Sequence, residues 1–148
     1  MYRFGKKSKK KLKTCHRDIQ TILNEVIRFY DFSVLEGIRT TERQQKLFAE
    51  GRTTLDGINK LSKHQHPSGV SHAVDIMPYY KGFNAFSSEN GPKSFYYMAG
   101  LVQGIARKLY DEGKITHIIR WGGNWDSDMD FFDDSSFFDL PHFELIKP

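Results

Sequence analysis

The spacing of apolar residues constrains the fold most, because it changes between a helical and a strand-like period along a single chain of 148 residues. Apolar positions recur at helical spacing over residues 16–30 and 93–112, which predicts two amphipathic helices. Shorter segments rich in strand-forming residues are found at 32–35, 73–77, 115–121 and 137–146. Because these elements follow one another without a regular strand–helix–strand repeat, the pattern predicts an α+β fold.

The chain length is suited to one compact domain, which we place at residues 1–148. A third helix is expected from Thr41 to Glu50, where Gly51 provides a C-terminal stop. We expect a basic N-terminal segment at 1–14 and a long active-site loop at 52–71, since neither stretch keeps a sustained apolar period.

Lysine dominates the start of the chain, and the formal net charge is +4. We interpret the lysine run as a solvated face, and no nucleic-acid recognition module accompanies it. No apolar run reaches the roughly 18 residues of a transmembrane helix, and none follows the lysines as in a secretory signal peptide. We therefore expect a protein made in the cytoplasm without a signal peptide.

Histidine and carboxylate residues are the only candidates for holding a metal. The single cysteine, Cys15, excludes an internal disulfide and a cysteine-rich zinc module. Five of the six histidines follow residue 60, and three of these precede Asp75 closely: His64, His66 and His72. Asp139 lies three positions before His142, a spacing that can place a carboxylate beside a histidine-bound metal.

These residues belong to three longer stretches that resemble a known family. The stretches are Ser62-Lys63-His64-Gln65, Ala73-Val74-Asp75 and Asp139-Leu140-Pro141-His142-Phe143-Glu144-Leu145. They resemble the motifs of the D-alanyl-D-alanine carboxypeptidase and L-alanyl-D-glutamate endopeptidase family of zinc enzymes, which includes bacteriophage endolysins. Residues 36–40 resemble the arginine segment of this family and residues 120–126 its aromatic loop, so the resemblance extends from about residue 4 to the end.

The resemblance implies a hedgehog-like fold, with a small antiparallel sheet flanked by helices, and a set of residue roles. His64, Asp75 and His142 would bind Zn²⁺, and Asp139 would act as general base and then as general acid. Arg39 would stabilise the developing oxyanion or hold a substrate carboxylate. Ser62 would bind substrate or orient the metal-binding loop.

The spacing within the first two stretches departs from the family pattern Ser-x-His-x-x-Gly-x-Ala-x-Asp, because the segment between His64 and Ala73 is longer. Two registers follow, with either His64 or His66 as the first ligand. We prefer His64, since the residues before it also fit and loops accept insertions readily. His72 would lie on the opposite strand face and is expected to be exposed.

The resemblance implies a peptidoglycan hydrolase of the endolysin type that cuts the L-alanyl-D-glutamate bond of stem peptides. It would act on the cell wall after release, and we expect a monomer. One alternative is a D-alanyl-D-alanine carboxypeptidase or dipeptidase of wall remodelling, and another is a non-catalytic zinc-containing binding module. Asp126, Asp128 and Asp130 alternate like the start of a calcium loop, but Phe131 and Phe137 occupy key positions, which predicts a polar turn.

Overall fold

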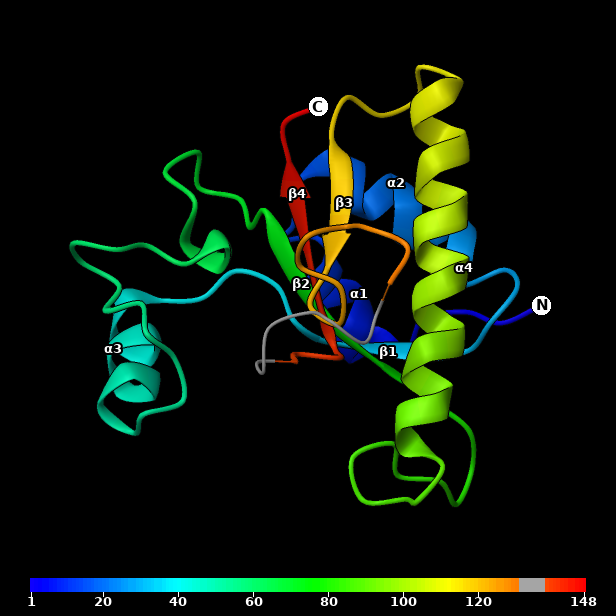
Figure 1. Ribbon diagram of the computed structural model, residues 1–148, viewed down its shortest axis with the longest axis horizontal. Coiled ribbons are helices and arrows are strands. Elements are labelled where there is room, and N and C mark those ends of the chain that lie inside the picture. Colours follow the sequence, from blue (N-terminus) through cyan, green and yellow to red (C-terminus); the bar gives the residue numbers. More distant parts are fainter. Residues whose placement is uncertain (131–137) are drawn as a thin grey trace.

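The computed structural model describes residues 1–130 and 138–148, and within them the chain forms one antiparallel sheet with helices around it (Figure 1). The elements in chain order are α1 (Lys6–Leu12), α2 (Arg17–Val26), β1 (Phe32–Glu36), α3 (Thr41–Ala49), the 3-10 helix η1 (Lys63–Gln65), β2 (Ala73–Pro78), α4 (Gly91–Asp111), β3 (Ile118–Trp121) and β4 (His142–Ile146). The predicted α+β class is confirmed.

The sheet has the strand order β1-β2-β4-β3, and every neighbouring pair is antiparallel. In Figure 1, α4 stands beside β3 with α2 behind it, while α3 lies on the other side of the sheet. Side chains alternate between the two faces of each strand. Val74 and Ile76 are fully buried in the hydrophobic core, and Asp75 between them lies on the opposite face.

Strand β4 repeats this alternation. Phe143 and Leu145 enter the hydrophobic core, whereas His142 and Glu144 lie on the face that Asp75 occupies. The predicted strand over 137–146 is shorter than expected, since β4 begins only after Pro141, which has no N–H for a ladder. Phe138 to Leu140 have no strand structure, and Phe137 lies outside the described residues.

The basic N-terminal segment contains a helix that the lysine run conceals. Phe4, Ser8 and Leu12 recur every four residues and are buried together on one side of α1, where the Ser8 hydroxyl accepts a hydrogen bond from the Val34 amide. Most of the lysines remain exposed, as predicted. The spacing of Phe4 and Leu12 was the available signal.

Two further expectations concern surface features. Asp126, Asp128 and Asp130 do form a polar turn, in which the Asp128 carboxylate accepts the Asp130 amide at 2.8 Å. The two phenylalanines that break the calcium-loop pattern, Phe131 and Phe137, lie outside the described residues. Among the residues that the structure describes, no helix combines the length and apolar character needed to cross a membrane.

Candidate functional site

The sheet register and η1 bring together three of the residues predicted as metal ligands. Asp75 on β2 and His142 on β4 are direct cross-strand partners, and His64 reaches them from η1. One ligand atom from each residue lies within 4.8 Å of the other two. This group of His64, Asp75 and His142 is called the ligand triad below.

His64 presents an unpaired nitrogen to the triad. Its Nδ1 lies 2.7 Å from the carbonyl oxygen of Gly37, so Nδ1 carries the proton and Nε2 carries a lone pair. Nε2 is buried without a hydrogen-bond partner and lies 3.5 Å from Asp75 Oδ1. A ring nitrogen and a carboxylate oxygen at this distance are held together by a shared proton or by a metal ion, and the donor types of these residues fit a metal ion.

Asp75 is held as a carboxylate by its surroundings. Its burial favours the neutral acid, but the imidazoles of His142, at 3.1 Å, and of His64 together outweigh burial and lower the Asp75 pKa below its ordinary 3.8. The Arg39 guanidinium lies 3.8 Å from the other carboxylate oxygen. Asp75 is therefore ionised at neutral pH, as a metal ligand must be.

His142 lies between two carboxylates. Its Nδ1 faces Asp75, and its Nε2 lies 2.9 Å from Glu144 Oε1. Burial lowers the His142 pKa, but hydrogen bonds to Asp75 and Glu144 outweigh burial and raise the pKa to about 9. Glu144 is itself fixed by Arg120 at 2.8 Å, so His142 Nε2 keeps its proton and donates it to Glu144, and Nδ1 is the nitrogen available to a metal.

Glu144 and Arg120 have functional positions that the sequence interpretation did not assign. The signal was present, because residues 142 and 144 share one face of a strand with a period of two. Arg120 is the cross-strand partner of Glu144 on β3. That pairing depends on the strand order, which the sequence does not reveal.

Asp139 lines the groove that contains the triad, in a turn just before β4. Its amide donates to the Gly122 carbonyl at 2.8 Å, and its carbonyl accepts the His142 amide at 3.0 Å. A Cβ atom at Gly122 would collide with the Asp139 carbonyl oxygen, so this close approach requires glycine. Burial raises the Asp139 pKa above its ordinary 3.8, although the nearby His142, His64 and Arg39 act in the opposite direction.

Arg39 lies at the site, and three of its five N–H donors are engaged by neighbouring side chains. The guanidinium makes a bidentate pair with Glu36 at 2.8 and 2.9 Å, and it donates to Gln44 Oε1 at 2.8 Å. Ser62 lies at the start of η1, where its hydroxyl accepts the His64 amide at 3.1 Å. Gln65 completes a capping box with Ser62, which fixes the turn that carries His64.

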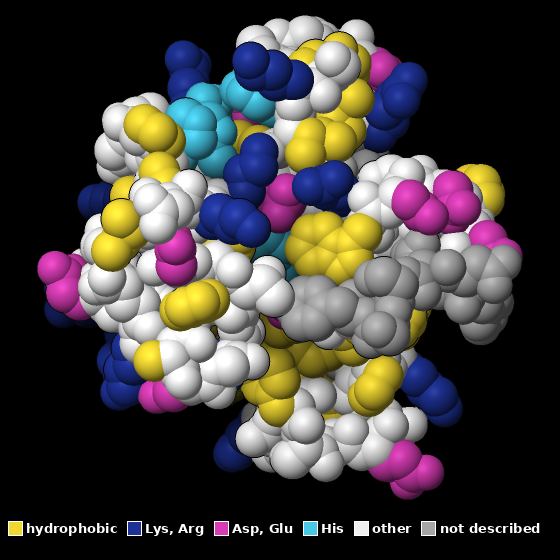
Figure 2. Space-filling model, turned by 60° about the vertical axis from the view of Figure 1, so that its left-hand side comes forward, with side chains coloured by type: hydrophobic (Ala, Val, Ile, Leu, Met, Phe, Trp, Pro, Cys, Tyr) yellow, Lys and Arg dark blue, Asp and Glu magenta, His cyan; other side chains and the backbone are white. Residues whose placement is uncertain are grey.

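A groove of about 1500 Å³ opens over the triad. It is lined by residues of the 52–71 loop, by Arg43 and Arg52, and by the turn that contains Asp139. Figure 2 shows histidine recessed in a hollow of this face, with Lys and Arg side chains beside it. The Trp125 ring covers one side, with its centroid 5.6 Å from that of His142.

The other two histidines of the central stretch lie elsewhere. The His66 ring stacks on the His72 ring, with centroids 3.5 Å apart, and His66 is not part of the ligand triad. The expectation that His72 is exposed is wrong, because only 9% of its surface is accessible. The His72 amide donates to the Lys63 carbonyl, and the His72 carbonyl accepts the Leu145 amide, so η1 and β4 cover the residue. Burial is the main cause that lowers the His72 pKa to about 4.

Comparisons with known proteins agree with this geometry. The family model for the phage L-alanyl-D-glutamate peptidase matches residues 1–146. The L-alanyl-D-glutamate peptidase of Escherichia phage T5 is 28% identical over 152 residues, which cover 98% of both chains. The crystal structure of the Serratia marcescens L-Ala D-Glu endopeptidase ChiX superposes with a TM-score of 0.67 at 23% identity, over 97% of this chain and 90% of that one.

The structural likeness shows the fold, and the match of the family model over nearly the whole chain shows the family. The family predicted from the sequence motifs is thereby confirmed. This chain belongs to the phage L-alanyl-D-glutamate peptidase family.

Proposed function

We propose that this peptidase depends on zinc and hydrolyses the L-alanyl-D-glutamate bond of peptidoglycan stem peptides, with His64, Asp75 and His142 as the metal ligands. One observation carries the zinc proposal: His64 Nε2 is buried without a hydrogen-bond partner and faces a carboxylate oxygen of Asp75 at 3.5 Å. Two imidazole nitrogens, one carboxylate and an open groove are the donor set of a catalytic zinc site.

The geometry also favours His64 over His66 as the first ligand. Ser62 and the Gly37 carbonyl orient the His64 ring from both ends of the side chain. His66 instead stacks on His72 and bonds to Ser68, at 2.8 Å. Replacing His64 by alanine is expected to abolish zinc binding at the ligand triad, whereas His66→Ala should leave zinc binding intact.

The residues of this chain would divide the reaction among them. When bound, zinc supplies Lewis-acid polarisation of the scissile carbonyl and a lower pKa for a water molecule. Asp139 would serve as the general base that takes up a proton and then as the general acid that gives it to the leaving amine, a task for which a raised pKa is suited. Arg39, held by Glu36 and Gln44, keeps a fixed positive charge beside Asp75 and stabilises developing negative charge.

Digestion of purified peptidoglycan tests the reaction and the bond. We expect a chelator to stop the release of peptides and added Zn²⁺ to restore it. New N-terminal D-glutamate identifies the endopeptidase, whereas free terminal D-alanine identifies the carboxypeptidase alternative. Activity that persists in protein shown by elemental analysis to contain no transition metal would refute zinc dependence.

The variant Asp139→Asn separates catalysis from metal binding. We expect turnover to fall by about 10²–10⁴-fold, because general acid–base catalysis contributes that much, while the zinc content stays unchanged. Asp111→Asn is the matched control, since Asp111 is exposed on α4, where it pairs with the neighbouring Arg107. Full activity of Asp139→Asn would favour a different base.

A further inference from the structure

A second group of histidines lies outside the ligand triad and has no part in the proposed reaction. His16 precedes α2, His72 precedes β2 and His117 precedes β3, so three segments far apart in sequence meet here. Their ring centroids are 4.8 Å apart for His16 and His72, 4.9 Å for His16 and His117, and 5.7 Å for His72 and His117. We call these three residues the histidine cluster.

The triad provides an internal reference for this spacing. The rings of His64 and His142 have centroids 5.2 Å apart and planes inclined at 64°. The corresponding angles in the histidine cluster are 67° for His16 with His72 and 73° for His16 with His117. Imidazoles at both places therefore meet edge to face at almost the same separation.

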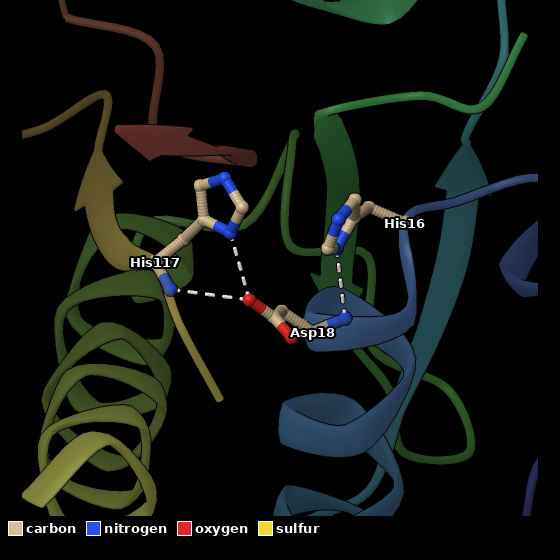
Figure 3. A group of neighbouring side chains, drawn as sticks. All are labelled: His16, Asp18 and His117. Carbon is tan, nitrogen blue, oxygen red and sulfur yellow. Dashed lines mark hydrogen bonds and ion pairs between the residues drawn. The ribbon is translucent and has the colours of Figure 1, made fainter. Parts of the chain in front are cut away.

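Asp18 orients one ring of the histidine cluster, as Figure 3 shows. Its Oδ2 lies 2.8 Å from His117 Nδ1, and because a carboxylate only accepts, Nδ1 carries the proton and Nε2 carries a lone pair. The same oxygen accepts the His117 amide and the amide and hydroxyl of Thr116, at 3.0 to 3.1 Å. A carboxylate that fixes the tautomer of a histidine in this way is the usual support of a metal-bound imidazole.

His16 and His72 complete the arrangement. His16 Nδ1 accepts the Asp18 amide at 3.0 Å and so caps α2, and ligation through this ring would exchange that cap for a metal bond. His72 is buried beneath the stacked ring of His66. His16 and His117 are only half-buried, so an ion has access from the solvent. One ligand atom each from His16, Asp18 and His117 lies within 4.8 Å of the others.

We propose that His16, Asp18 and His117, whose ligand atoms all lie within 4.8 Å of one another, form a second binding site for one divalent transition-metal ion of the zinc type, with His72 packed beside it. Two imidazoles beside one carboxylate favour zinc, cobalt, nickel or copper over magnesium or calcium, which prefer oxygen ligands. The bound ion clamps the start of α2 to the start of β3. This inference does not depend on the proposed reaction, because it uses none of the triad residues.

Metal stoichiometry of the full chain tests the site. After chelator treatment and desalting, Zn²⁺ is titrated calorimetrically into wild type and single variants, and bound zinc is counted by elemental analysis. We expect two equivalents for wild type, one for His64→Ala, and one for His16→Asn and for His117→Gln. The His16→Asn variant keeps a side-chain cap on α2, so its loss of zinc does not follow from loss of the helix start.

His66→Gln is the matched control, and it should retain two equivalents because His66 covers the cluster without ligating. Asp18→Asn should weaken the second site by about 10–100-fold and leave the first unchanged. Circular dichroism of each variant shows that it is folded, and if one variant does not fold the others decide. A single equivalent in wild type that His64→Ala removes would overturn the proposal, as would a second equivalent that survives both His16→Asn and His117→Gln.

Discussion

Glu144 shows how one carboxylate decides which nitrogen of a histidine faces the groove. It accepts from His142 Nε2 and is held by Arg120, so two hydrogen bonds fix both its oxygens. The pKa of Glu144 is lowered to about 2, because these partners outweigh the effect of burial, which acts in the opposite direction. The carboxylate therefore remains an acceptor at neutral pH, and His142 Nδ1 remains directed at Asp75.

Replacing Glu144 with glutamine should weaken zinc binding at the triad by about 10–100-fold, because a neutral amide holds the imidazole less firmly and lowers its basicity. Competition with a chromophoric chelator, in a His16→Asn background, measures this affinity without the proposed second site. Glu112→Gln serves as the control, since Glu112 is a surface residue that pairs with Lys114. An unchanged zinc affinity would show that Glu144 has no part in the site.

Cys15 is a second residue whose chemistry depends on burial. Only 1% of its surface is accessible, and burial is the main cause that raises its thiol pKa from 9.0 to about 12. We expect the folded protein to react hardly at all with a disulfide reagent between about pH 8 and 9, because the thiolate is the reactive form. The same protein in denaturant should react at once.

The sign of the associated stability change follows from the two pKa values. The folded thiol holds its proton more tightly, so its contribution to stability is complete below pH 9.0 and is lost as the pH rises from 9.0 through about 12. Rapid reaction of the native thiol near pH 8, at a rate equal to that in denaturant, would contradict the raised pKa of Cys15.

At the scale of elements, the end of α1 sets the position of the carbonyl that orients His64. That carbonyl belongs to Gly37. A Cβ atom at Gly37 would overlap the Lys11 carbonyl oxygen and the Thr14 hydroxyl. The Thr14 hydroxyl also accepts the amide of Ile38 at 2.9 Å. The helix in the lysine-rich segment thus supports the candidate site from behind.

We expect Gly37→Ala to lower the free energy of unfolding by about 1–3 kcal/mol, because backbone atoms of α1 cannot move aside easily. Zinc affinity at the triad should fall with it, since the Gly37 carbonyl would shift. Gly100→Ala is the matched control, because Gly100 lies in α4 with open space around it. Alanine at this position should raise the free energy of unfolding by about 0.5–1 kcal/mol. Denaturant titration of both variants measures the two changes, and equal effects would refute the argument.

At the scale of the whole molecule, the triad joins η1 to the paired strands β2 and β4. Its ligands come from η1, β2 and β4, so an ion bound there links the loop to the sheet. The loop between α3 and β2 contributes little to the hydrophobic core. Metal binding and folding should therefore be coupled.

Zinc at 100 times its dissociation constant should stabilise the His16→Asn protein by about 2.7 kcal/mol. For a domain of this size, such a change raises the melting temperature by roughly 5–11 °C. Thermal unfolding followed by circular dichroism, with and without zinc, measures the shift. His64→Ala in the same background should show no shift, and a shift of equal size in that double variant would place the stabilising ion elsewhere.

Much of the architecture could be predicted from the sequence, because the signals for helices and strands are local. The apolar period predicted α2, α3, α4 and the four strands to within a few residues, and Gly51 does end α3 with a positive φ of 71°. The helix α1 was missed, since lysine outnumbers the few apolar residues that it buries. The motif order also predicted the family, because it combines residue type with spacing.

Tertiary structure decided what depends on strand order. The sequence by itself determined which side chains could hold a metal, since only histidine and carboxylates were available with a single cysteine. It did not determine that Arg120 supports Glu144, or that His16, His72 and His117 meet, because residues 16, 72 and 117 become neighbours only when three separate elements pack together. Side-chain type is a property of the residue, whereas the distance between two side chains is a property of the packed sheet and its helices.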